Sequence, residues 1–359
     1  MTGYDRKFLL DSVALLQGNR ASHMGVHQYA DHRATRHGKP MSGAALCREI
    51  EQNHKAYYIP SIERQMIAGM ADDVKSYLPE GTPFIDLGPG TLKTVAEKSL
   101  PFIRAVQSNI YIPIDTSIKF CSEAGNVVRK HVPRAKVVPC FENFFSDDAE
   151  PACERPALAF LGGITIANIE APLSKELPRT QLIRHLGNLA RITNGGWLLA
   201  STDANQDEDE NRTMYFENAL IEVNHLFRMT EELPFVGFDP YAFEYDPFWI
   251  RESSQLAHTA IAMKDMNVIV RSPFWSGVID IKAGTRLHLK NSFKYRDQFF
   301  SSCAEAAGFT VIKIWRHDNK PMRLFLLRAI PLQAGAADVG RTIASGALRV
   351  EASTASLVI

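Results

Sequence analysis

A glycine-rich turn is the first place along the chain where the residue types could hold a ligand. The segment Phe84–Thr91 reads FIDLGPGT, which puts Gly88 and Gly90 directly after a short apolar run. Glycines at the end of a strand let the backbone approach a ligand closely, and the free N–H groups of the next helix point there too. The turn lacks the third glycine of GxGxxG and the GKS or GKT ending of a P-loop. It therefore disfavours dinucleotide and phosphate-gripping sites, and leaves a ligand without phosphates or a purely structural turn.

Polar side chains also follow the next two apolar runs. Asp115 comes directly after the run 110–114, where an acidic side chain can accept hydrogen bonds from both hydroxyls of a ribose. Capping of the next helix explains Asp115 equally well on its own, but together with the glycine turn ribose binding is favoured. Asn143 and Phe144 follow the third run, where an amide could bond the amine of an adenine and a ring could pack against it. A core phenylalanine beside a turn asparagine is the alternative for that pair.

An amide closes a run with paired glycines. Residues 160–168 read FLGGITIAN, so Asn168 follows a fourth apolar run, at the sheet edge where ligands bind in open α/β folds. A carboxamide there can orient an amine by accepting its N–H.

These positions require a sheet whose strands end at one edge. Apolar runs alternate with helical patterns, which is typical of a parallel sheet with helices on both faces. We expect strands over 83–87, 110–114, 135–139, 157–161 and 196–200, and helices over 61–78, 92–106, 118–130 and 181–192. Two later strands, 310–315 and 322–327, would close the sheet as an antiparallel hairpin after a helix over 294–307. The expected fold class is an α/β doubly wound sheet with an antiparallel last strand.

The alternation breaks after residue 203. The acidic stretch 203–211 is expected to be an exposed loop, followed by helix-like sequence over 218–229 and strands over 256–263, 267–270 and 285–289. We therefore expect a core over 61–203 and 292–330, a smaller α+β lobe inserted at 204–291 and completed by 1–60, and a loosely ordered tail over 331–359.

Composition restricts the partners. Lys plus Arg equals Asp plus Glu at 40 each, and no long basic run is present, so a nucleic-acid partner is not favoured. No apolar run is long enough for a membrane span, and the first residues do not read as a signal peptide. The cysteines show no CxxC pair or metal-type spacing, so we expect a cytoplasmic protein with reduced thiols and no metal.

The order of motifs carries a resemblance. YYxxxxE at Tyr57–Glu63, LGxG with KT, a strand ending in Asp115, PxxxNF and FLGG with TIAN follow one another along the chain. In that order they resemble the histidine Nα-methyltransferase family of ergothioneine biosynthesis, which includes relatives that N-methylate other amino acids. The resemblance extends over residues 57–328 and implies a class I methyltransferase fold with S-adenosylmethionine as cofactor.

The resemblance also implies roles for individual residues. Lys93 would pair with the carboxylate of the donor, and Asn168 would grip the amino or carboxylate end of the acceptor. The implied cofactor-binding residues are Gly88, Gly90, Lys93, Asp115, Asn143 and Phe144, and those of the acceptor site are Tyr57 or Tyr58, Asn168 and Ser292. Methyl transfer needs an unprotonated amine, and Tyr57, Tyr58 and His288 are candidates to orient it or relay its proton.

Several positions depart from the family pattern. The glycine loop is one residue shorter before Lys93-Thr94, Asn143 stands where an Asp is usual, and the FLGG run carries an extra residue. Lys290 stands where the histidine-specific enzymes have a glutamate, two residues before the serine. A lysine does not suit an imidazole, so we expect the amine of another small amino acid or amino-acid-derived metabolite as acceptor, with Lys290 pairing an acidic or polar group. A solvent-facing Lys290 is the alternative.

Two other functions stay open on the sequence. An aminopropyltransferase of the spermidine-synthase type would use a decarboxylated donor on a similar fold. A non-catalytic relative would keep the S-adenosylmethionine site and lose the acceptor site. The sequence does not specify the acceptor, the number of methyl groups transferred or the oligomeric state.

Overall fold

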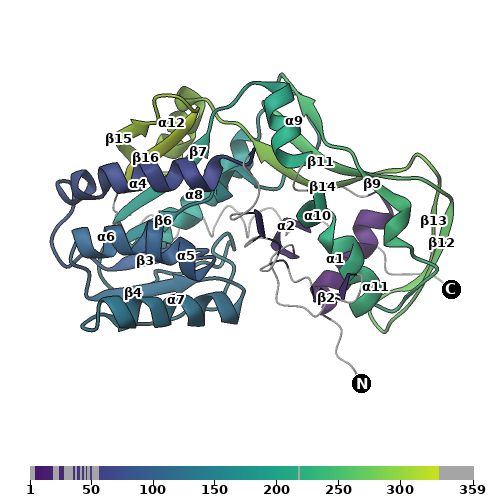
Figure 1. The fold of residues 1–359 in the computed structure, drawn as a ribbon, viewed down its shortest axis with the longest axis horizontal. Helices are drawn as coiled ribbons and strands as arrows, with labels where there is room; N and C mark the ends of the chain where they lie inside the picture. The colour runs from purple at the N-terminus through teal and green to yellow at the C-terminus, as the bar shows by residue number, and fades with distance from the viewer. Residues whose placement is uncertain are drawn as a thin grey trace, which may run out of the picture.

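The computed structural model describes residues 5–18, 24–27, 35–36, 39–40, 43, 46, 49–50, 56–216 and 219–330. These residues form two lobes, one built on a large sheet at the left of Figure 1 and a smaller one at the right. The tail expected over 331–359, and parts of the expected N-terminal segment 1–60, lie outside the described residues.

The larger lobe contains a seven-stranded sheet with the order β15-β16-β7-β6-β3-β4-β5. Its parallel strands are β3 (Phe84–Leu87), β4 (Ile110–Ile114), β5 (Lys136–Val137), β6 (Leu158–Leu161) and β7 (Trp197–Asp203). β16 (Met322–Ala329) pairs antiparallel with both β7 and β15 (Phe309–Arg316). The expected doubly wound α/β sheet with its antiparallel last strand is thereby confirmed.

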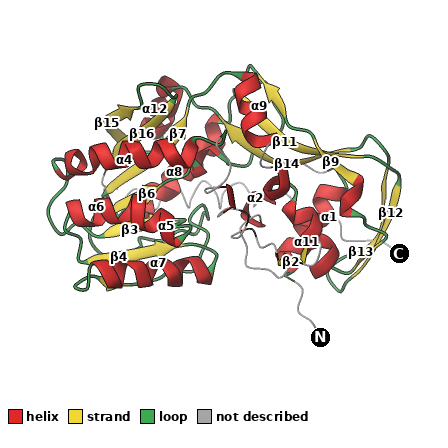
Figure 2. Cartoon of the chain, viewed as in Figure 1, coloured by secondary structure: helices red, strands yellow, loops and turns green. Residues whose placement is uncertain are grey.

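Helices lie on both faces of this sheet, as Figure 2 shows. They are α4 (Ile59–Lys75), α5 (Leu92–Thr94) continued by a π-helix (Val95–Ser99) and α6 (Leu100–Ala105), then α7 (Ile118–His131), α8 (Arg179–Ile192) and α12 (Asp297–Ala306). In β3, Phe84 packs in the cluster that includes Phe102, whereas Ile85 packs in the cluster that includes Leu186. Successive side chains of a strand point to opposite faces, so a strand covered on both sides is apolar nearly throughout.

The smaller lobe is built from the segment after β7 and from the N-terminus. Its elements are α9 (Glu208–Phe216), α10 (Ala219–Glu222), α11 (Asn224–Glu232), β8 (Phe235–Val236), a 3₁₀ helix (Pro240–Ala242), β9 (Phe243–Tyr245), β10 (Phe248–Ile250), β11 (Gln255–Ala262), β12 (Met266–Arg271), β13 (Ser276–Ile281) and β14 (Arg286–Phe293). The N-terminal part adds α1 (Arg6–Leu16), α2 (Met24–His27), β1 (Thr35–Arg36) and β2 (Lys39–Pro40). Phe8 of α1 packs in the same buried cluster as Val268 and Leu289, so the N-terminus contributes to the core of this lobe.

Two long antiparallel strands, β11 and β14, join the lobes (Figure 1). Leu256 and Phe293 belong to a cluster of the large sheet, whereas Ala260 and Leu287 belong to the core of the smaller lobe. The strands are therefore buried at both ends in different cores, which fixes how the two lobes face one another.

One sequence expectation is wrong, and some elements of the structure were not predicted. The acidic stretch 203–211 is not an exposed loop, because Asp203 is fully buried at the end of β7 and residues 208–216 form α9. A buried carboxylate needs partners from distant segments, which a local pattern does not reveal. The strand β13 and the helix α1 were also not predicted.

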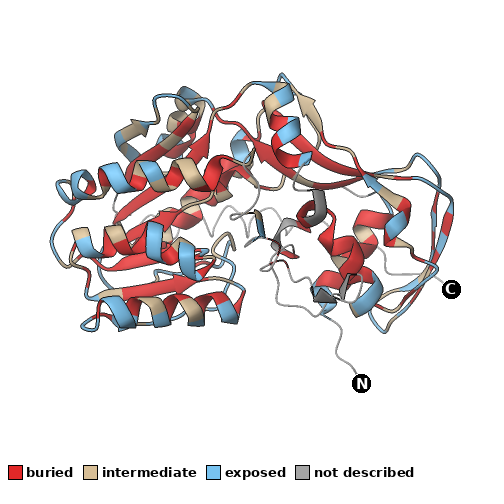
Figure 3. Ribbon diagram, viewed as in Figure 1, coloured by how far each residue is buried: buried red, intermediate tan, exposed pale blue. Residues whose placement is uncertain are grey.

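Figure 3 shows the sheet strands of the larger lobe buried and the outer faces of its helices exposed. Among the described helices, none has the length and apolar composition needed to cross a bilayer.

Candidate active site

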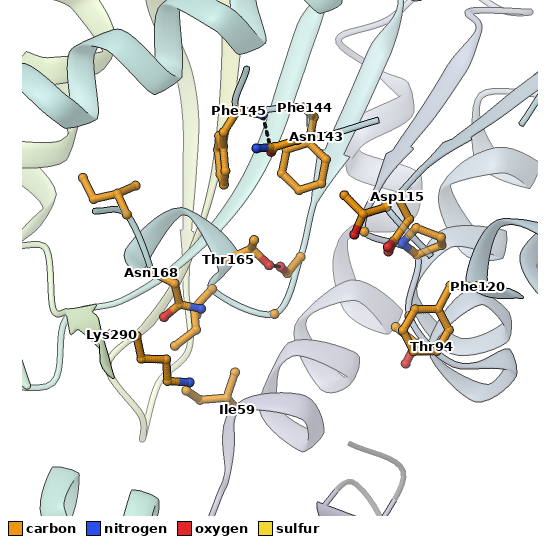
Figure 4. A pocket seen from close by; sticks show the side chains of 18 of the residues that line it. Ile59, Thr94, Asp115, Phe120, Asn143, Phe144, Phe145, Thr165, Asn168 and Lys290 are labelled. Atoms are coloured by element: carbon orange, nitrogen blue, oxygen red, sulfur yellow. Dashed lines mark hydrogen bonds between the residues drawn. The ribbon is translucent and has the colours of Figure 1, made fainter. Parts of the chain in front are cut away.

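A cavity of about 300 Å³ lies where the two lobes meet. Its lining combines the carboxyl ends of the parallel strands with α10 and β14 of the smaller lobe. Among the residues predicted from the sequence, the lining includes Tyr57, Gly88, Gly90, Asp115, Asn143, Phe144, Asn168 and Lys290. Figure 4 shows Asn143, Phe144 and Phe145 gathered along one side, Asp115 across from them, and Asn168 with Lys290 at a separate end.

The glycine turn has the backbone conformation that its residue types predict. Gly88 and Gly90 have φ values of 71° and 69°, a left-handed region that side chains with a Cβ rarely adopt. The N–H of Gly88 donates to the carbonyl of Ile114 at 2.9 Å, which fixes the turn against β4. A Cβ on Gly88 would point at the ring of Phe144, 3.9 Å away. The bare backbone of the turn and the Phe144 ring therefore lie next to each other at the cavity wall.

Asp115 is half-buried at the cavity and does not cap the next helix. Its Oδ1 accepts the N–H of Ser117 at 2.8 Å. Ser117 is the N-cap of α7, because its Oγ accepts the N–H of Phe120 at 3.2 Å. The turn after β4 thus holds the Asp115 carboxylate at the cavity wall, while helix capping is done by its neighbour.

Asn143 and Phe144 lie on the loop after β5. The Oδ1 of Asn143 accepts the N–H of Phe145 at 3.0 Å, which orders the loop. The rings of Phe144 and Phe145 meet edge to face at 4.7 Å, and Phe145 packs on His185 at 4.7 Å. These contacts hold the Phe144 ring upright beside the glycine turn.

Lys93 does not line the cavity, contrary to the role that the resemblance implied for it. Its side chain is exposed at the second position of α5. The same helical segment, continued by its π-turn, presents Thr94 and Lys98 to the cavity instead. The direction in which each side chain leaves this short helix decides which of its residues face the cavity.

Lys98 belongs to a buried group that the sequence reading missed. Its ammonium pairs with Glu63 of α4, and both side chains are buried. The other oxygen of Glu63 accepts the N–H of Gly163 at 2.8 Å. A Cβ on Gly162 would lie 2.8 Å from the Phe160 ring and 3.3 Å from this carboxylate. The carboxylate therefore anchors the paired-glycine turn to the helix that carries Lys98, and Glu63 of the motif YYxxxxE was its available sequence signal.

Asp86 is a second missed residue of the cavity. It lies inside β3, is 2% exposed, and accepts a hydrogen bond from the hydroxyl of Tyr111 at 2.8 Å. Burial raises the pKa of Asp86 to about 6, with the nearby Asp115 adding to the rise. Asp86 stands within the apolar run 84–87 of the sequence, and in the structure it lines the cavity.

The raised pKa of Asp86 predicts a stability that falls as the pH rises. Between about pH 4 and pH 6 the folded protein binds a proton that the unfolded chain has released, so the free energy of unfolding decreases with pH. The shift of about two units corresponds to about 3 kcal/mol. The Asp86→Asn variant cannot bind this proton, so its free energy of unfolding should not show this decrease. Measured by urea unfolding, the stability of the variant relative to the unaltered protein should therefore be higher at pH 7 than at pH 4. An unchanged difference between the two proteins across this range would contradict the assignment.

Asn168 is held from behind by the smaller lobe. It follows the 3₁₀ helix Thr165–Ala167, and its Oδ1 accepts the hydroxyl of Ser292 at 3.2 Å. Ser292 is buried and does not itself line the cavity, so its predicted contact with an acceptor is replaced by this supporting bond. Nε2 of the buried His258 lies 2.9 Å from the same hydroxyl. With its oxygen occupied by Ser292, the amide turns its N–H₂ group to the cavity.

The two adjacent tyrosines separate into different environments. Tyr57 is half-buried, lines the cavity and meets Tyr215 edge to face at 5.8 Å. Tyr58 does not line it, because its hydroxyl donates to the buried Asp203 at 3.0 Å. Burial, followed by the charge of Asp203, raises the pKa of Tyr58 above its ordinary value, so Tyr58 is excluded as a proton acceptor at neutral pH.

The remaining predicted positions come from β14. His288 lines the cavity, and its Nε2 lies 2.7 Å from Oδ1 of Asn291. Lys290 also lines it, and its Nζ lies 2.7 Å from Oε2 of Glu222 on α10. The lysine is therefore a buried, paired cation and does not extend into solvent.

Comparison with known sequences decides the family. Residues 41–329 match the sequence profile of a family described as histidine-specific, S-adenosylmethionine-dependent methyltransferases. The chain belongs to this family. It is an S-adenosylmethionine-dependent methyltransferase, as the motif order predicted.

Other relatives of this methyltransferase are more distant. It is 26% identical over 249 residues to an uncharacterized protein, y4iF, of Sinorhizobium fredii, a match covering 67% of this chain and 78% of that protein. A solved S-adenosylmethionine-dependent methyltransferase from Clostridium acetobutylicum aligns with a TM-score of 0.42 and 9% identity, covering 79% of this chain and 97% of that one. Magnesium protoporphyrin IX methyltransferase from Synechocystis aligns with a TM-score of 0.41 and 10% identity, covering 80% and 94% respectively. At these identities, only the geometry of the cavity itself bears on the roles of individual residues.

That geometry fits the cofactor of the family. Gly88 and Gly90 keep the wall free of side chains where a nucleoside would cross the strand ends. Asp115 and Phe144 line the same cavity, so the carboxylate could accept the hydroxyls of a ribose and the ring could pack against a base. Among the described residues that line the cavity, the lysines are Lys98 and Lys290, and each is paired with a buried glutamate, Glu63 and Glu222 respectively.

Proposed function

We propose that the methyltransferase transfers a methyl group to the α-amine of a small amino acid other than histidine, or of a metabolite derived from one. The observation that carries the proposal is the shared cavity, in which the donor side of the sheet meets Asn168 and Lys290. The proposed partner is a small-molecule amine, with no nucleic acid and no membrane, and the proposed compartment is the cytoplasm.

The proposed binding residues divide between the two ends of the cavity. Gly88, Gly90, Asp115, Asn143 and Phe144 would hold the donor at the end formed by the strands of the large sheet. S-adenosylmethionine supplies an activated methyl group on a sulfonium, so the protein has to contribute proximity, alignment and exclusion of water.

The acceptor end supports an amino acid through its polarity. The N–H₂ group of Asn168 suits the carboxylate of an amino acid, because Ser292 already donates to the amide oxygen. Tyr57 lines the same cavity and would orient the amine. Lys290 stands where the histidine-specific relatives have a glutamate, which argues against an imidazole as the distal group.

A two-stage experiment tests this function. Calorimetry with S-adenosylmethionine should show binding. A mass-shift screen of amino acids and related amines should then show products heavier by roughly 14 Da for each methyl group transferred. Donor binding without methylation of any amine would favour the non-catalytic relative. Binding of the decarboxylated donor alone would favour the aminopropyltransferase, and either result would overturn the proposal.

Asn168 offers a specific test of the acceptor end. We expect the Asn168→Asp variant to lower kcat/KM for the acceptor by about a hundredfold, because a carboxylate would repel the acceptor's carboxylate and would cost a charge-assisted hydrogen bond. The dissociation constant of S-adenosylmethionine should stay within about twofold, since the donor lies at the other end of the cavity. Equal loss of donor affinity would place Asn168 in the donor site and contradict the assignment.

A further inference from the structure

The acceptor end of the cavity contains a buried ion pair. Lys290 of β14 and Glu222 of α10 both line the cavity, and their side chains are 10% and 3% exposed. Figure 4 shows Lys290 beside Asn168, at the end away from Asp115. Burying two charges costs several kcal/mol per ion, which their attraction repays only in part, so such a pair is weak evidence for a role in stability.

The charges of the pair are balanced within the cluster around it. Glu222 Oε2 lies 3.5 Å from Nδ1 of His258, which is fully buried. Burial, then the charges of Lys290 and Lys294, lowers the pKa of His258 well below its ordinary value, so the imidazole stays neutral. Lys294 is itself paired with Asp203 at 2.6 Å. Lys290 and Glu222 therefore neutralise one another and need no ion from a ligand.

We propose that the acceptor ends, opposite its amine, in an uncharged group with both a hydrogen-bond donor and an acceptor, of which a carboxamide is the simplest. This proposal rests on the proposed function and names the acceptor's side chain. The amide oxygen would accept from Lys290 Nζ and the amide N–H₂ would donate to Glu222.

Charged side chains are excluded by the same balance. An anionic group would have to draw Lys290 away from Glu222, leaving a carboxylate that is 3% exposed without its cation. A cationic group would in turn compete with Lys290 for Glu222. Either change introduces one uncompensated charge into a buried cluster, which is strongly unfavourable.

The first test compares two amides with the acids of equal size, and with three amino acids that have basic side chains. Purified protein with S-adenosylmethionine is assayed for initial rates with glutamine, asparagine, glutamate, aspartate, arginine, lysine and histidine. We expect kcat/KM for glutamine to exceed that for glutamate at least tenfold, and an amide to be the best acceptor of the panel. A best acceptor with an acidic, basic or imidazole side chain would overturn the proposal. Methylation of none of them, with donor binding intact, would instead count against the proposed function.

The second test alters the charge of the pair. Glu222→Gln keeps the shape of the side chain and leaves Lys290 with its charge uncompensated, so the ratio of kcat/KM for glutamate over glutamine should rise at least tenfold. Lys290→Met leaves the carboxylate and should raise the ratio for arginine over glutamine. Unchanged ratios in both variants would overturn the proposal, provided that donor affinity shows each variant to be folded.

A matched control is available on the surface. Lys264 and Asp239 form an ion pair at 2.6 Å with side chains 58% and 38% exposed. Lys264→Met removes the same charge from a solvated site outside the cavity lining. It should leave every acceptor ratio unchanged, and a shift equal to that of Lys290→Met would mean that net charge alone explains the result and would overturn the proposal.

Discussion

Replacing Asp115 with alanine is expected to weaken the binding of S-adenosylmethionine by at least about a hundredfold. The carboxylate lies at the cavity wall after β4, where it can accept both hydroxyls of a ribose. Hydrogen bonds to a charged group contribute about 1.5–3 kcal/mol each, and about 1.4 kcal/mol changes an affinity tenfold. Isothermal titration calorimetry with the purified variant measures the loss directly.

Two further variants separate ribose binding from local structure. Asp115 also accepts the N–H of Ser117 at 2.8 Å, so its removal costs stability that a thermal melt records. Asp115→Asn keeps this acceptor and loses the charge. Its affinity for S-adenosylmethionine should lie between those of the unaltered protein and Asp115→Ala. Asp72→Ala, on the exposed side of α4, removes a carboxylate far along the helix and should bind the donor normally. Unchanged donor affinity in Asp115→Ala would reject the ribose assignment.

Replacing Lys294 with methionine is expected to lower the free energy of unfolding by about 3–5 kcal/mol. Lys294 Nζ lies 2.6 Å from Asp203, and neither side chain is exposed. Asp203 ends β7 of the large sheet, whereas Lys294 follows β14 from the smaller lobe. The substitution would leave the buried carboxylate of Asp203 without its cation. Among the described residues, the hydrogen-bond donors that remain are the hydroxyl of Tyr58 at 3.0 Å and the N–H of Asn205 at 3.2 Å.

Urea unfolding followed by circular dichroism measures this loss. The double variant Asp203→Asn with Lys294→Met removes both charges, and it should recover part of the stability because no unpaired ion stays buried. Lys264→Met, which breaks an exposed pair, should cost less than about 1 kcal/mol. A loss in Lys294→Met as small as that of the exposed pair would show that the buried pair does not couple the two lobes.

Local patterns in the chain were sufficient for the sheet and for the strand ends that line the cavity. The alternation of apolar runs and helical patterns predicted the parallel strands, and the two later apolar runs at 310–315 and 322–327 predicted the antiparallel hairpin. Gly88 and Gly90 predict a tight turn directly after β3, and both have positive φ values in the structure. Because ligands of open α/β sheets bind at the carboxyl ends of the strands, this turn was expected at the binding site. Asp115 follows from the same rule, because it is the residue directly after β4.

Positions that depend on helix phase were predicted less well. Lys93 and Lys98 both lie near the glycine turn, but α5 continues into a π-helix, which changes the face that each residue presents. Tyr57 and Tyr58 are adjacent, so one faces the cavity while the other turns to Asp203. A shift of one residue reverses such assignments, and a motif does not fix the phase.

The amino-acid sequence was enough to predict the class of fold, the strand ends that line the cavity and the family. The tertiary structure alone decided which distant groups meet in the buried interior, as with Glu222 beside Lys290, Asp203 beside Lys294 and Ser292 behind Asn168. The physical reason is that strands and turns follow from neighbouring residues, whereas the partner of a buried charge depends on how β14 and α10 pack against the large sheet.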